Sequence, residues 1–155
     1  MIPVKIGFIQ PTKHNRPAIS STPSGLLTSE VDTLTGDPSD PAFDKLIKLA
    51  KKAGFNYRNN VYLYQSLGWT FCQGSVPWHT DPGLSYIVSW AARLPSLETS
   101  ELITKHGSLP IKEGYVFAFN ADQGHAWLCN NEDPTVFAQI TVGRRRKVPT
   151  APLIP

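Results

Sequence analysis

This chain of 155 residues carries a formal net charge of +3, and 17% of its residues are charged while 41% are hydrophobic. That length and balance are typical of one globular domain with its own core, and they exclude the disordered and fibrous classes. No stretch of the sequence approaches the ~20 consecutive apolar residues of a membrane-spanning helix, so no membrane span is expected. Fourteen prolines and eleven glycines predict many turns, and hence strands in preference to long helices.

The N-terminus and the cysteines predict an intracellular, cytoplasmic location. Residues 1–8 show no charged region followed by an apolar run, so a secretory signal is not expected. Two cysteines, Cys72 and Cys129, do not make a disulfide framework, and a reducing compartment is the default. Much of the positive charge sits in the run 144–147, which either contacts an anion or is simply solvated.

Residues 1–39 are predicted to form an N-terminal arm, followed by a helix. The segment 10–40 is rich in proline, serine, threonine and glycine, which is typical of an extended, loop-like chain and makes it a candidate lid or wrapped arm. Asp40 is a favourable N-cap, and Pro41 suits the first helical position. Apolar residues then recur at helical spacing with lysines on the other faces, and Gly54 is expected to end the helix.

After the helix the pattern predicts strands and turns. Segments 60–67 and 84–92 are rich in β-branched and aromatic residues, and segment 135–142 alternates between two faces. Short strands at this density are typical of a sandwich or a jelly roll. The chain is therefore predicted to be a single domain, with its core at 40–147 and an irregular tail at 148–155. Shorter strands are expected at 101–104, 109–111 and 115–119.

Three polar residues carry the most specific signal: His79 and Asp81 in the tripeptide His-Thr-Asp, and His125 farther on. Residues i and i+2 of a strand point to the same face, so His79 and Asp81 can converge on one ion, and His125 must come from another strand. Two imidazoles and one carboxylate are the protein ligands of non-haem iron(II) oxygenases, which leave the other face of the metal open. The alternative is that all three are ordinary polar residues. Their apolar neighbours Trp78 and Trp127 argue against it, because uncompensated polar groups in apolar surroundings are costly.

The order of these residues resembles the 2-oxoglutarate/iron(II)-dependent dioxygenases, whose double-stranded β-helix carries His-x-Asp, a later histidine and a basic residue on the last strand. The resemblance covers residues 40–147 and includes the helix before the strands. It implies a mainly β fold, a double-stranded β-helix (jelly roll) with a supporting N-terminal helix. It also implies that His79, Asp81 and His125 are the catalytic iron(II) ligands, with 2-oxoglutarate and dioxygen as co-substrates.

The resemblance further implies a cation for the far carboxylate of 2-oxoglutarate, a task that a bidentate arginine performs best. Positions 134–139, where the family most often has this residue, hold no arginine or lysine, which departs from the pattern. Parity puts Arg145 on the more polar face of the last predicted strand, whereas a bulge would bring in Arg144. Arg93 is a third candidate, and Tyr64 on an early strand is a candidate for lining the co-substrate pocket.

The interval between Asp81 and His125 is short compared with the family pattern, and it leaves little room for the usual intervening strands and hairpins. We therefore predict a minimal barrel with short loops, in which a sheet could be trimmed. Substrate-binding elaborations, which normally sit in insertions and in the N-terminal arm, are then reduced.

The resemblance implies an enzyme that hydroxylates or demethylates its substrate, because a carboxylate at position 81 fills the position that a halogenase leaves to a halide. The substrate stays open between a peptide, a nucleic acid, whose phosphates reward basic residues, and a small molecule. Two alternatives come from other classes. The same three residues could hold zinc in a hydrolase, where the metal activates water, or the chain could be a non-catalytic jelly-roll binding or structural module.

Overall fold

The computed structural model describes most of the chain, in seven separate segments. The greater part of the predicted N-terminal arm and the whole predicted tail at 148–155 lie outside the described residues. No helix in the described part is long and apolar enough to cross a membrane. The described residues are 3–11, 31–35, 41–55, 62–72, 74–94, 100–129 and 135–144.

Helix α1 (Pro41–Lys52) forms where the apolar periodicity predicts it. Its predicted N-cap, Asp40, lies outside the described residues. Phe43, Leu46 and Ala50 are buried along one face, while the lysines of the helix are all exposed. The helix therefore buries its apolar stripe against the rest of the molecule, as an amphipathic surface helix does.

The end of α1 is closed by two backbone hydrogen bonds. The Gly54 N–H donates to the Lys51 carbonyl at 3.0 Å, and the Phe55 N–H donates to the Ala50 carbonyl at 2.9 Å. This pair of bonds is the Schellman motif, which needs a left-handed residue just past the helix. Gly54 adopts that conformation with φ of +88°, at little cost because it has no Cβ.

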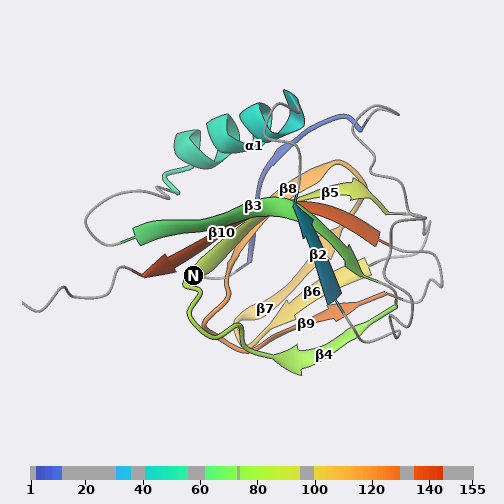
Figure 1. Cartoon of the computed structure of the whole chain (residues 1–155). Coiled ribbons are helices and arrows are strands. Elements are labelled where there is room, and N and C mark those ends of the chain that lie inside the picture. The colour runs from blue at the N-terminus through green and yellow to red at the C-terminus, as the bar shows by residue number, and fades with distance from the viewer. Residues whose placement is uncertain are drawn as a thin grey trace, which may run out of the picture.

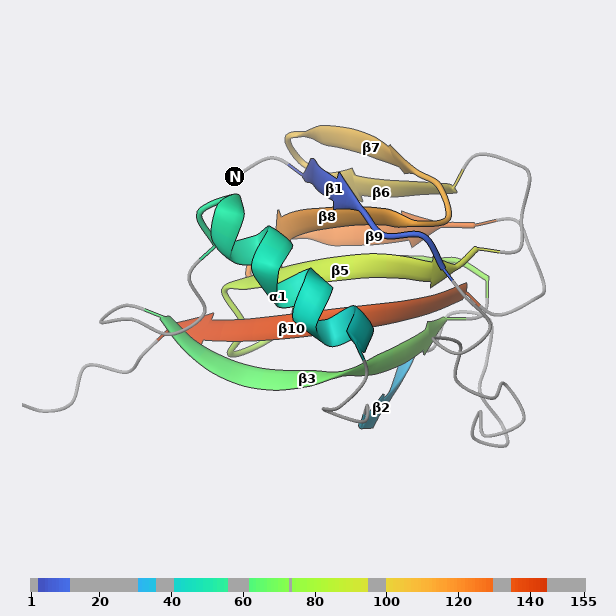
Figure 2. The same ribbon diagram turned by 90° about the horizontal axis from the view of Figure 1, so that it is seen from above.

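The strands form two antiparallel sheets that face each other (Figure 1). The larger sheet has six strands in the order β1-β8-β5-β10-β3-β2, and the smaller has four in the order β4-β9-β6-β7. Seen from above, α1 crosses the outer face of the larger sheet (Figure 2). The strand bounds are β1 (Val4–Phe8), β2 (Val31–Thr35), β3 (Tyr62–Cys72), β4 (Val76–His79), β5 (Tyr86–Arg93), β6 (Ser100–Thr104), β7 (Gly107–Ile111), β8 (Tyr115–Asn120), β9 (His125–Leu128) and β10 (Thr135–Arg144).

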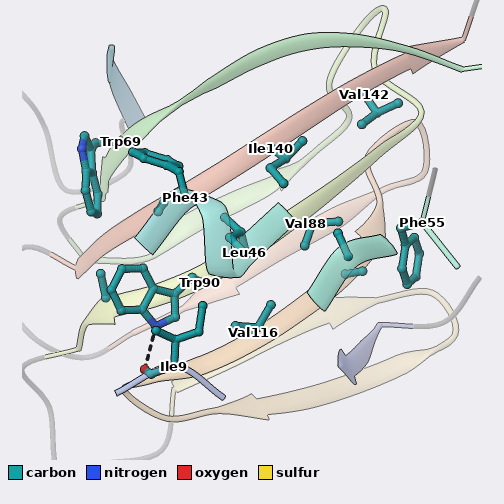
Figure 3. Close-up of a cluster of buried hydrophobic side chains, with 14 of the residues drawn as sticks. Ile9, Phe43, Leu46, Phe55, Trp69, Val88, Trp90, Val116, Ile140 and Val142 are labelled. Carbon is teal, nitrogen blue, oxygen red and sulfur yellow. Dashed lines mark hydrogen bonds between the residues drawn. The ribbon is translucent and has the colours of Figure 1, made fainter. Parts of the chain in front are cut away.

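The first core fills the space between α1 and the six-stranded sheet (Figure 3). Trp90 is completely buried in it, and its indole N–H donates to the Ile9 carbonyl at 3.0 Å. Phe43 of the helix packs edge-on against Trp69, with ring centroids 5.2 Å apart. Alternate residues of the central strands supply the rest of this face: Val88 and Ala92 from β5, Val116 and Ala118 from β8, and Val136, Ala138, Ile140 and Val142 from β10.

The second core lies between the two sheets and uses the intervening residues of the same strands. Because strand side chains alternate, β5, β8 and β10 each contribute to both cores. The smaller sheet supplies the opposing side chains. The members from the larger sheet include Ile87, Ala91, Phe117, Phe119 and Phe137, and those from the smaller sheet include Val76, Leu102, Ile111 and Trp127.

The predicted jelly roll is confirmed, and its differences from prediction are local. The sheet is not trimmed: β5, β6, β7 and β8 all lie between His79 and His125. They fit because they are short and tightly joined, β6 and β7 by the two residues 105–106 alone. Strands β1 and β2 form where none was predicted, and β2 lies in the segment expected to be loop. His79 and His125 lie on two strands, β4 and β9, as predicted, but β4 ends at His79, so Asp81 lies just past the strand instead of within it.

Candidate metal centre

Strands β4 and β9 bring the two predicted histidine ligands together. His79 ends β4, His125 begins β9, and the two residues are directly opposite in the antiparallel register. Asp81 follows two residues after His79, and its N–H donates to the Ala121 carbonyl at 2.9 Å, in the loop that leads to His125. Pairing between two strands and one backbone bond to the loop thus fix all three residues.

The three side chains converge as the sequence predicts. Nε2 of His125 lies 3.0 Å from Oδ2 of Asp81, and Nε2 of His79 lies 3.5 Å from Oδ1. The two imidazole centroids are 4.4 Å apart. One donor atom from each residue lies within 4.8 Å of the others, close enough to share one metal ion.

Both imidazoles are held in the tautomer that metal binding requires. Nδ1 of His79 lies 2.7 Å from the Pro77 carbonyl oxygen, and Nδ1 of His125 lies 2.8 Å from the Gln123 carbonyl oxygen. A carbonyl only accepts, so each Nδ1 carries a proton, and Nε2 is the ring nitrogen that faces Asp81 and binds a metal once it is unprotonated. Bonds of this kind orient the histidines of metal sites. The donor set therefore fits a divalent transition metal.

The two histidines differ in their surroundings. The His125 side chain is 5% exposed, whereas those of His79 and Asp81 are 36% and 30% exposed. Burial acts to lower the pKa of His125, but the hydrogen bonds with Asp81 and Gln123 and the charge of Asp81 prevail and raise that pKa. A proton on Nε2 and a metal ion therefore compete for the same lone pair.

A cavity of about 190 Å³ adjoins the three residues and lies between the two sheets. Most of its wall is apolar, and Phe119 packs against the His125 ring with centroids 4.9 Å apart. No lysine or arginine is among the described residues that line it. Besides the three candidate ligands, the lining residues are Thr70, Cys72, Val76, Leu84, Ile87, Leu102, Phe117, Phe119, Trp127, Phe137, Gln139 and Thr141.

One wall of the cavity is polar, which the prediction of site residues missed. Oγ1 of Thr70 donates to Oε1 of Gln139 at 2.9 Å, and Nε2 of Gln139 donates to Oγ of Ser89 at 3.2 Å. These bonds link β3, β10 and β5, and Thr141 lies on the same wall. The alternation of β10 was the available signal, since it separates Gln139 and Thr141 from the apolar face.

None of the four candidate co-substrate residues is among the described residues that line the cavity. A bulge in β5 sets Arg93 opposite Val136, a residue of the helix-side core, and Arg93 is absent from the described cavity lining. Tyr64 pairs with Val142, and its side chain lies outside the described part of the structure, as does that of Arg144. Arg145 lies wholly outside the described residues.

Solved structures with a similar fold include 2-oxoglutarate/iron(II) oxygenases. A viral collagen prolyl hydroxylase from Paramecium bursaria Chlorella virus-1, solved with 2OG, is 12% identical, with 79% of this chain and 83% of that chain covered and a TM-score of 0.56. An oxidoreductase of the 2OG-Fe(II) oxygenase family from Burkholderia pseudomallei is 10% identical, with coverage of 82% and 78% and a TM-score of 0.49. A cupin-2 domain protein from Shewanella frigidimarina is 11% identical, with coverage of 59% and 76% and a TM-score of 0.38.

The comparisons with sequences find nothing: no family model and no curated protein matches this chain. The likeness therefore rests on shape, and at 12% identity it concerns the fold alone. Two facing antiparallel sheets with one covering helix agree with that likeness. The chain has a double-stranded β-helix fold similar to that of the viral prolyl hydroxylase.

Proposed function

We propose that this chain is an iron(II)- and 2-oxoglutarate-dependent dioxygenase that hydroxylates a C–H bond of its substrate. The convergence of His79, Asp81 and His125 beside a cavity between the sheets is the observation that carries this proposal. Two neutral imidazoles and one carboxylate suit iron(II) and leave its opposite coordination positions open. The oxygenase-like fold supports the same interpretation.

In the proposed site, His79 and His125 bind iron(II) through Nε2, and Asp81 binds it through its carboxylate. The Pro77 and Gln123 carbonyls keep each Nδ1 protonated and each ring oriented. When bound, iron(II) and 2-oxoglutarate supply the oxidative decarboxylation of the keto acid to succinate and carbon dioxide, coupled to hydroxylation by dioxygen. The apolar wall of the cavity limits access of water to the reacting groups.

The polar wall of the cavity is the proposed contact for the far end of 2-oxoglutarate. Thr141 pairs through Ile87 with Phe119, beside His125, so it is level with the metal centre. Gln139 lies two residues deeper along β10, about 7 Å at the usual rise of a strand. If the far carboxylate points the other way along the chain, away from Gln139, parity with Phe137, Gln139 and Thr141 favours Arg145 as the cation, and Arg144, Arg93 and Tyr64 remain the other candidates.

The proposed substrate is a peptide. The viral protein whose fold matches with a TM-score of 0.56 is a collagen prolyl hydroxylase, which favours a peptidyl side chain over a nucleic acid or a free small molecule. We also propose an intracellular location, since Cys72 and Cys129 are both free thiols and a reducing compartment preserves them.

An anaerobic titration tests the proposal. Iron(II) and 2-oxoglutarate are added to metal-free protein, and a visible charge-transfer band is expected to appear. Asp81→Ala should abolish the band by removing a ligand. Asp122→Ala, which removes an exposed carboxylate from the loop before His125, is the matched control and should keep it.

The other outcomes distinguish the alternatives. Tight zinc binding without an iron band would favour the zinc hydrolase, and failure to bind either metal would favour a non-catalytic jelly roll. With iron bound, release of succinate under air should depend on 2-oxoglutarate. Faster release with proline-containing peptides than with oligonucleotides would support the proposed substrate class, and the reverse order would contradict it.

A further inference from the structure

The two histidines of the metal centre are held very differently. His125 lies on β9, which pairs with β4 on one side and β6 on the other. His79 lies on β4, which is an edge strand: among the described strands, β9 alone is its neighbour in the sheet. The β4–β9 ladder is irregular between Val76 and His79, so backbone pairing holds His79 at few points. A side-chain contact outside the ladder adds to the backbone contacts that keep His79 opposite His125.

Trp78 and Gly124 make such a contact on the outer side of these strands. Trp78 precedes His79, so its side chain points away from the cavity, and it is 55% exposed. Its indole nevertheless covers Gly124: a Cβ built on Gly124 would lie 2.3 Å from Cε2 and 2.3 Å from Cζ2 of the ring. Gly124 immediately precedes His125. The ring therefore reaches from β4 to the residue that precedes β9.

Gly124 is needed here for space and not for its backbone angle. It is not among the glycines with positive φ, so alanine would fit its conformation. Only the closeness of the Trp78 ring forbids a methyl group, since real Cβ atoms do not approach other atoms so closely. The contact is thus tight enough to fix the separation of the strands at this level.

We propose that Trp78 and Gly124 form an outer clamp that positions His79 against His125 for metal binding. The clamp rests on the proposed metal site. Trp78 is a positioning residue, because it touches neither the metal nor the cavity and acts through His79. An exposed tryptophan beside an edge-strand ligand supplies the rigidity that the broken ladder lacks.

A double-mutant cycle tests the clamp. Metal-free full-length protein is titrated with Co²⁺, and the dissociation constant and visible spectrum are recorded for Trp78→Ala, Gly124→Ala and the double variant. Each single substitution should weaken binding about tenfold, the scale on which groups that orient metal ligands act. The double variant should bind no more weakly than Trp78→Ala, because the added methyl then meets no ring.

The spectrum separates positioning from a general loss of stability. Co²⁺ bands of Trp78→Ala should approach those of His79→Ala, because the edge ligand is the one released. Gly7→Ala is the matched glycine control, since its Cβ would press on Leu49 of α1 at 2.9 Å, far from the metal. Leu128→Ala is the control for Trp78→Ala, because it removes an exposed apolar side chain from the neighbouring strand β9. Both controls should bind Co²⁺ as the native chain does.

Two results would overturn the clamp. The first is native Co²⁺ affinity in Trp78→Ala. The second is a double variant whose loss of Co²⁺ binding free energy equals the sum of the two single losses, because Gly124→Ala would then act on His125 without the ring. Because Trp78 is largely exposed, its removal leaves the core intact, and Trp78→Ala decides the question even if Gly124→Ala does not fold. A native chain that binds no Co²⁺ refutes the metal site and the clamp together. If the native chain binds Co²⁺ and Trp78→Ala binds it with the same affinity, the clamp is refuted and the metal site stands.

Discussion

The two faces of the six-stranded sheet are built from the same strands and serve different ends. Facing α1, alternate residues of β5, β8 and β10 are apolar and close around Trp90. Facing the smaller sheet, the intervening positions leave a cavity of about 190 Å³ and include Thr70, Ser89, Gln139 and Thr141. The side chains of the helix-side face pack against one another and against α1. The cavity-side face is less tightly packed and instead has hydrogen-bonding groups and open space beside the candidate ligands. Metal binding and stability should therefore respond to different substitutions.

The largest expected effect is on the cavity side, at a metal ligand. Asp81→Asn keeps the size of the side chain and removes its charge, so metal affinity should fall by more than about 100-fold, beyond the usual cost of changing a group that only orients a ligand. Stability of the metal-free protein should change by less than about 1 kcal/mol, because the pair with His79 is partly exposed and the amide can still bond to His125. Calorimetric titration with Co²⁺ and urea unfolding measure the two quantities.

The opposite pattern is expected on the helix side. Leu46 of α1 is completely buried, and Leu46→Ala should cost about 3 kcal/mol through lost burial and the cavity it leaves. Metal affinity of the folded fraction should stay at the native value. Urea unfolding of the metal-free chain followed by Co²⁺ titration below the transition checks both. A large loss of affinity in this variant would mean that the two faces are coupled.

The helix-side face is also the part that the sequence predicts best. The apolar spacing of Phe43, Leu46 and Ala50 sets the buried stripe of α1, and Gly54 marks its end because the Schellman cap requires φ above zero there. Alternation in segment 135–142 separates the two faces of β10 correctly. Local periodicity is sufficient for these features, since each depends on residues that are neighbours along the chain.

The cavity side depends on pairings that no local pattern encodes. The Thr70–Gln139 hydrogen bond joins residues 69 positions apart, and nothing near Gln139 in the sequence indicates its partner. The extent of strand β4 was not predictable, because Val-Pro-Trp-His does not alternate, and the strand ends before Asp81. The three candidate ligands were predictable from residue type and spacing, and the structure brings them together. Their arrangement, with His79 opposite His125, follows only from the register of two short strands.

The pH dependence sharpens the comparison within the site itself. Burial lowers the pKa of His125, but Asp81 and the Gln123 carbonyl outweigh it and raise that pKa. A group with a raised folded-state pKa stabilises the metal-free protein at low pH, and this contribution is lost as pH rises through the folded pKa. Metal binding needs the free Nε2, so affinity should fall about tenfold per pH unit below the same pKa. The two trends therefore run in opposite directions.

Urea unfolding and Co²⁺ titration across pH 5–9 would reveal these trends together. In Asp81→Asn the charge that raises the pKa of His125 is absent and burial remains, so the dependence of metal-free stability on pH should diminish over this range. Parallel changes in stability and affinity with pH would contradict the assignment, because they would point to a titrating group other than His125.

The smallest expected effect compares two neighbours on β10 that face opposite ways. Gln139→Leu removes the bonds to Thr70 and Ser89 at similar volume and should cost about 1–2 kcal/mol. Ile140→Val, on the helix side, should cost about 1 kcal/mol. Only Gln139→Leu should raise the KM for 2-oxoglutarate in a succinate-release assay, with Co²⁺ affinity unchanged in both. If both variants keep the native KM, the polar wall stabilises the sheet without contacting the co-substrate, and recognition of the far carboxylate passes to a residue such as Arg145.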